Sequence, residues 1–111
     1  MAKTEHDLAV EVLVELNVTE GEEEPSAADE QLVIERYQER LITLVDEDYA
    51  DWSSNVIPDA AMPGLRLVVA YECARAFGRV PDASLEDEGL TKLARLMRKK
   101  ATYEPVRPDY F

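Results

Sequence analysis

The stretch from Pro63 to Phe77 is the most apolar part of this 111-residue chain, and it constrains the fold more than any other feature. Its apolar side chains extend around most of a helical cylinder instead of forming one narrow stripe. One face holds Leu65, Val69, Cys73, Ala76 and Phe77, and Val68, Ala70 and Ala74 widen it. Such a helix is either the central one of a bundle or shared with a neighbouring subunit. Gly78 closes it, and Pro81 prevents its continuation.

An amphipathic helix is predicted before it, from about Thr4 to Leu16, because apolar residues recur there every three to four positions. Thr4 with Asp7 resembles a capping box, and Asn17 predicts the end of the helix. A strand over Val10–Val14 is the alternative that we favour less. The next segment, 17–26, carries four glutamates with a glycine and a proline. This composition favours a solvated hinge that buries nothing over a metal or cation site.

A long helix is predicted from a cap formed by Ser26 and Asp29 to about Asp46 or Glu47. Its predicted apolar face is Leu32, Val33, Tyr37, Leu41, Leu44 and Val45, and its predicted wet face is Glu35, Arg36, Glu39 and Arg40. A structured connection follows over 48–62, in which Trp52 and Ile57 are the apolar anchors. Trp52 is either a ligand platform or, as we favour, a plug at the end of the bundle.

The last predicted helix runs from about Leu85 to Lys100, and Ser84 with Asp87 gives it a capping-box-like start. Its predicted apolar face is Leu85, Leu90, Leu93, Leu96 and Met97. Gly89 weakens it by up to about 1 kcal/mol relative to alanine. The whole pattern predicts an all-α, small four-helix bundle-like domain over 1–101 with an extended C-terminal arm over 102–111.

Charge is distributed unevenly along the chain. Residues 1–60 carry 17 acidic and 3 basic side chains, and residues 61–111 carry 7 acidic and 9 basic ones, which gives −14 and +2 and sums to the net charge of −12. The interpretation that we favour from charge alone is that the acidic surface keeps the protein soluble. The alternative is that one end is repelled by nucleic acid while the other docks on an acidic partner. Tight duplex binding by the bulk of the chain is not expected, since lysine and arginine supply most of such affinity.

Groups that could carry catalysis are few. His6 is the only histidine and lies near the terminus, and Cys73 is the only cysteine and lies on an apolar face. Buried cysteine is the usual state of such a residue. No Cys/His spacing suggests zinc, and no glycine-rich loop suggests a phosphate site. We therefore expect no enzyme, cofactor or metal. A single cysteine, the absence of a secretory leader and of an apolar run of membrane length predict a protein made in a reducing cytoplasm.

Two positive features remain near the end of the chain. Lys92, Arg95 and Lys99 recur at helical spacing, so they form a basic row that either touches phosphates or an acidic partner, or compensates the helix dipole. The arm is rich in prolines and aromatic residues, which suits an extended segment that becomes ordered against a protein partner. Its candidate contact residues are Tyr103, Pro105, Val106, Arg107, Pro108, Asp109, Tyr110 and Phe111.

The order of these elements resembles the tailed-phage head–tail connector family, also called adaptor or head-completion proteins. The resemblance covers about residues 26–111. It lies in Tyr49-Ala50-Asp51-Trp52 through Val56-Ile57-Pro58, in Leu65–Gly78 with its ending Ala-Tyr-Glu-Cys-Ala-Arg-Ala-Phe-Gly, and in the closing Pro105-Val106-Arg107-Pro108-Asp109-Tyr110-Phe111.

This resemblance implies a structural virion protein. About twelve copies of it would form a ring under the portal protein, extend the DNA channel and receive the next tail component, whether nozzle, stopper or tail tube. It also implies that the C-terminal arm reaches along the portal and that DNA passes through the bore without specific contacts. The alternative is a small acidic regulatory or DNA-mimicking protein that blocks a nucleic-acid-binding partner, although a mimic has no use for an aromatic arm.

Overall fold

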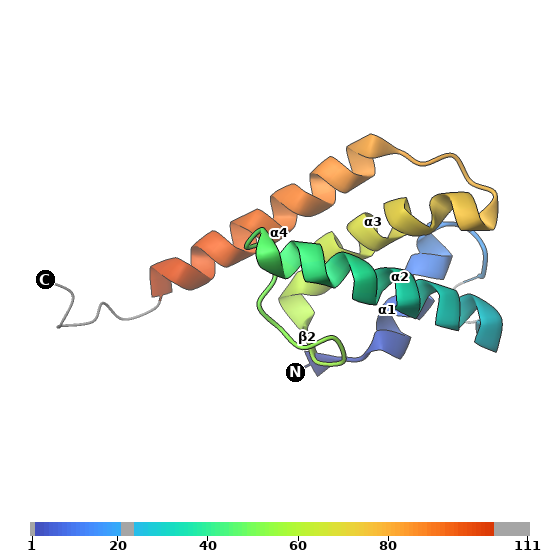
Figure 1. Ribbon diagram of the computed structural model, residues 1–111, viewed down its shortest axis with the longest axis horizontal. Helices are drawn as coiled ribbons and strands as arrows, with labels where there is room; N and C mark the ends of the chain where they lie inside the picture. The colour runs from blue at the N-terminus through green and yellow to red at the C-terminus, as the bar shows by residue number, and fades with distance from the viewer. Residues whose placement is uncertain (1, 21–23, 104–111) are drawn as a thin grey trace, which may run out of the picture.

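The computed structural model describes residues 2–20 and 24–103, without the side chains of 101–103 (Figure 1). This part of the chain forms four α-helices, α1 (Glu5–Glu15), α2 (Ala27–Asp46), α3 (Met62–Cys73) and α4 (Ala83–Tyr103). The short 3-10 helices η1 (Asp59–Ala61) and η2 (Ala74–Phe77) flank α3. The strands β1 (Ala2–Lys3) and β2 (Ile57–Pro58) form a short antiparallel pair, which the sequence did not predict. The prediction of a small all-α domain is confirmed.

Helix α3 is the centre of the domain, because it packs against α1, α2 and α4. Its buried residues are Met62, Gly64, Leu65, Leu67, Val68, Val69, Ala70 and Cys73. They join a single core with the buried faces of α1 and α2, and α4 contributes Leu93 to it. The central helix predicted from the apolar stretch is thus confirmed within one chain. Its last turn differs from the prediction, since it narrows into η2 and leaves Ala76 exposed.

The backbones of α3 and α4 approach each other closely at two buried glycines, Gly64 and Gly89. A Cβ atom added to Gly89 would lie 2.6 Å from the carbonyl oxygen of Gly64 and 2.8 Å from Cγ2 of Val68. A Cβ atom added to Gly64 would in turn lie 2.9 Å from the carbonyl oxygen of Gly89. Gly89 therefore lowers the intrinsic helix propensity of α4 but allows the two helices to touch.

The first two helices begin and end at local capping residues, most of which the sequence predicted. Thr4 accepts a hydrogen bond from the backbone N–H of Asp7 and completes the predicted capping box, and Ser26 caps α2. Asn17 has φ 59° and Asp48 has φ 63°, so both occupy the left-handed conformation that ends α1 and α2.

The end of α1 is also held by a residue far away in the chain. Arg79 Nε donates to the carbonyl oxygen of Leu16 at 2.9 Å, and its Nη2 donates to that of Asn17 at 3.0 Å. A guanidinium group at this place satisfies carbonyls left free by the helix end and complements the helix dipole. The connection between η2 and α4 is thereby tied to the end of α1.

Helix α4 begins and ends elsewhere than predicted. Its cap is Asp82, whose Oδ1 accepts from the backbone N–H and the hydroxyl of Ser84 at 3.0 and 2.6 Å, so the predicted cap at Ser84 is wrong. At the other end α4 continues to Tyr103, so Thr102 and Tyr103 are helical and not part of an extended arm. The remaining arm residues, 104–111, lie outside the described residues.

Three burial predictions also fail. Val45 is 45% exposed, although we placed it on the apolar face of α2. Val18 is partly buried against the core, so the acidic loop does bury one of its residues. Arg40, predicted to lie on the wet face, is half-buried and forms ion pairs with Glu72 of α3 and Glu86 of α4. Helical periodicity does not distinguish a solvated arginine from one that joins three helices.

Trp52 acts as the predicted plug. Its indole N–H donates to the hydroxyl of Tyr37 at 3.2 Å, and that hydroxyl donates to the carbonyl oxygen of Ser54 at 2.8 Å. Tyr37 is fully buried, and its burial raises the pKa of the phenol to about 12. The pair fixes the 48–62 connection against α2, with Ile57 buried beside it.

We predict that Gly89→Ala destabilises the domain by about 1–3 kcal/mol, because the clash with a backbone carbonyl outweighs the gain in helix propensity. Urea unfolding followed by circular dichroism measures this. Thr91→Ala, an exposed position of the same helix, is the control. A Gly89→Ala protein as stable as the control would contradict the close contact.

We predict that Asp82→Ala lowers stability at neutral pH and that Ser84→Ala lowers it less, since Asp82 is the cap. Hydrogen bonds from Ser84 lower the pKa of the Asp82 carboxyl below 3.8. Its contribution is therefore complete above pH 3.8 and disappears as the pH falls through the lower folded-state pKa. Unfolding curves of both variants between pH 2 and 7 test this. Equal losses in the two variants would restore Ser84 as the cap.

Candidate functional site

The C-terminal half of α4 is the most basic part of the protein. Residues 92–100 carry five cationic and no acidic side chains, whereas the rest of the chain carries 24 acidic and 7 basic ones. The two parts hold +5 and −17, which sum to −12. Figure 1 shows that this half of α4 extends beyond the other helices. The positive charge is therefore concentrated on a projecting element.

The basic row, Lys92, Arg95 and Lys99, lies on the outer side of α4. All three residues are exposed. None of them forms an ion pair with any residue in the described ranges 2–20 and 24–103. By contrast, Lys100 points to the other side of the helix and pairs with Asp51. Because no described residue pairs with them, the three cations of the row are available to another molecule.

A groove lies on the opposite side of the same helix segment. It has a volume of about 540 Å³ and is open to solvent. Its lining residues are Glu47, Asp48, Tyr49, Asp51, Ala94, Met97, Arg98 and Lys100. Tyr49 and Met97 give it an apolar floor, and charges of both signs border it. The Lys100–Asp51 ion pair joins its two walls.

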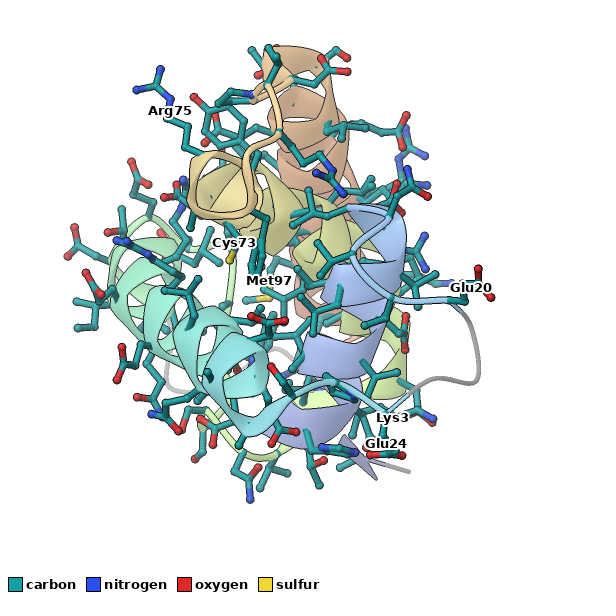
Figure 2. The ribbon with its side chains drawn as sticks, turned by 90° about the vertical axis from the view of Figure 1, so that its right-hand side faces the viewer. Lys3, Glu20, Glu24, Cys73, Arg75 and Met97 are labelled. Atoms are coloured by element: carbon teal, nitrogen blue, oxygen red, sulfur yellow. The ribbon has the colours of Figure 1, made fainter. Side chains whose placement is uncertain are left out.

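The two remaining candidate residues, Cys73 and His6, make contacts that support the fold. The thiol of Cys73 is buried in the core (Figure 2), and burial raises its pKa to about 12, so it is not a thiolate at neutral pH. His6 bonds to Glu30, and this hydrogen bond raises the pKa of the imidazole. The bond links the start of α1 to the start of α2.

Among the described residues, no group of three or more histidine, cysteine or acidic side chains has the arrangement of a metal site. Nor does any helix in the described ranges combine the length and the apolar character needed to cross a bilayer. The candidate arm residues from Pro105 to Phe111 lie outside the described residues.

Sequence reasoning missed two arginines that organise the acidic surface. Arg40 joins α2 to both α3 and α4, with an Nη1 to Glu86 Oε2 distance of 2.8 Å. Arg66 of α3 lies between Glu11 and Glu15 of α1, with N to O distances of 3.4 and 3.3 Å. Glu11 and Glu15, which pair with Arg66, lie four residues apart in α1. Glu72 and Glu86, which pair with Arg40, lie on different helices. Only the first of these spacings is visible in the sequence.

Comparison with models of protein families, with curated proteins and with solved structures finds no match.

We predict that replacing Lys92, Arg95 and Lys99 together by glutamine changes the free energy of unfolding by no more than about 0.5 kcal/mol, because exposed side chains without partners contribute little. Arg40→Gln is the contrasting variant. It leaves Glu72 and Glu86 half-buried without their cation, and we expect a loss of about 1–3 kcal/mol. Denaturant titration measures both. A strongly destabilised triple variant would show that the row is structural.

Proposed function

We propose that this protein is a head–tail adaptor of a tailed phage, a structural virion protein without enzymatic activity. About twelve copies would form a ring below the portal protein, surround the DNA channel and receive the next tail component. The proposal starts from the resemblance of residues 26–111 to connector proteins, and the helical fold agrees with it.

The observation that carries the proposal is the separation of charge between α4 and the rest of the domain. The projecting half of α4 holds five cations, and the chain continues from it directly into the proline- and aromatic-rich residues 104–111. A basic helix leading into such a segment suits docking on an acidic protein surface, since charge complementarity steers association and the aromatic side chains supply apolar contact area.

The acidic remainder of the domain suits the passage of DNA. Exposed acidic side chains outside the basic row include Glu24, Glu47, Asp48 and Glu88, and the −17 outside residues 92–100 repels phosphate at short range. A channel with such a lining would not hold DNA by counterion release, the main source of non-specific affinity. DNA would therefore pass without adhering.

The portal test uses a deletion that begins at Glu104 and leaves α4 intact. The protein is mixed with the purified portal ring of the same virus, and the mass of the mixture is measured by light scattering. We expect the full chain to give a complex larger than the portal, and the chain lacking 104–111 to give the portal mass alone, because the arm supplies the contact area. Circular dichroism of the truncated chain checks that the helices persist.

Undiminished assembly of the truncated chain would contradict the role of the arm. If neither chain binds the portal and the full chain instead inhibits a nucleic-acid-binding enzyme in competition with DNA, the DNA-mimicking alternative replaces the adaptor.

A further inference from the structure

Helix α2 presents an exposed face with both apolar and acidic side chains. Ile42 is 73% exposed in the second turn from the end of the helix, and Val45 beside it is 45% exposed. Glu35, Glu39 and Asp46 lie around them and are exposed as well. The three acids form no ion pair with residues in the described part of the chain. We call these five residues the α2 face.

The basic row of α4 has the opposite charge and the same length. Lys92 and Lys99 are seven positions apart, and so are Glu39 and Asp46. Each pair therefore spans about 10.5 Å along its helix. The aliphatic stems of lysine and arginine cover apolar surface while their charged ends reach acids at its edge, so the row can cover Ile42.

The sequence around the two surfaces distinguishes the two possible directions of docking. With the helices antiparallel, Lys92 meets Asp46 and Lys99 meets Glu39. With the helices parallel, the same cations would still find acids, but Glu88 would lie opposite Glu35, and both carry negative charge. Like charges opposite one another are unfavourable. The antiparallel direction is therefore the better one.

We propose that the α2 face of one copy of this protein binds the basic row of a second copy, with α2 and α4 antiparallel. The second copy is the partner because the complementary surface is present on the chain itself. Within the described residues no ion pair joins the α2 face to the basic row of the same chain. Each copy holds one of each surface, and such contacts can repeat from copy to copy.

This inference deepens the proposed function, because it supplies the contact between adjacent subunits of the ring. It is nevertheless testable without the portal. Nucleic acid would be the other partner for three cations, but the acidic surface of the same domain opposes it.

The experiment couples carboxylates to lysines with a water-soluble carbodiimide in a mixture of unlabelled and ¹⁵N-labelled full-length protein. Peptides that join a light chain to a heavy one identify contacts between copies. We expect mixed pairs linking Lys92 to Asp46 and Lys99 to Glu39, at concentrations in the millimolar range and also in the portal complex. Their yield should fall as salt is added, since exposed ion pairs are screened.

Charge reversal tests the register. Asp46→Lys and Lys92→Glu, each alone, should reduce the mixed cross-link between residues 39 and 99 by about tenfold, because each puts like charges opposite one another. The chain that carries both reversals should recover it. Glu24→Lys, an exposed acid outside the α2 face, is the control and should leave the yield unchanged. Recovery in the double variant shows that the single variants were not simply misfolded.

Mixed cross-links confined to other faces, or none in either the free protein or the portal complex, would overturn the inference. So would a double variant that fails to recover, or addition of DNA that removes the cross-links and protects the basic row. Cross-links of the expected register in a protein that does not bind the portal would keep the inference and reject the adaptor.

Discussion

The backbones of α3 and α4 touch at Gly64 and Gly89, and the position of the basic row depends on this contact. An added Cβ atom at either glycine would lie within 3 Å of the carbonyl oxygen of the other. Since α3 is also the helix against which α1 and α2 pack, the contact fixes α4 relative to the whole domain. The projecting half of α4 is consequently held at a defined angle although most of its own side chains are exposed.

Ion pairs between the helices also fix their relative positions, in addition to the contact of the two glycines. Arg40 connects α2 with α3 and α4, and Arg66 connects α3 with α1. Each arginine pairs with acids from an otherwise strongly acidic surface, so these two cations neutralise charge where helices meet. The acids of the α2 face have no such internal cation among the described residues, which leaves them available for a contact between copies.

Much of the fold was predictable because it follows from local chemistry. Thr4 and Ser26 cap the first two helices as their positions before apolar runs indicate, Asn17 ends α1, and the apolar stretch from Pro63 forms the central helix. The features that were missed depend on tertiary contacts. Gly89 was predicted only to weaken α4, because its contact partner, Gly64, is 25 positions away in the sequence. The cap at Asp82 was missed because Ser84 and Asp87 form an equally good local pattern two residues later.

Of the candidate site, the basic row was predicted and is exposed. The arm stays a prediction, because residues 104–111 lie outside what the structure describes.

The two hydrogen bonds from Arg79 to the end of α1 join positions that are 63 and 62 residues apart. The local turn at Asn17 ends α1, and Arg79 adds to it a contact that is present only when α3 and η2 have returned the chain to this place. Unfolding of α1 would therefore also release the connection that leads into α4. The end of α1 and the connection into the helix that carries the basic row thus share one contact, and we expect them to unfold together.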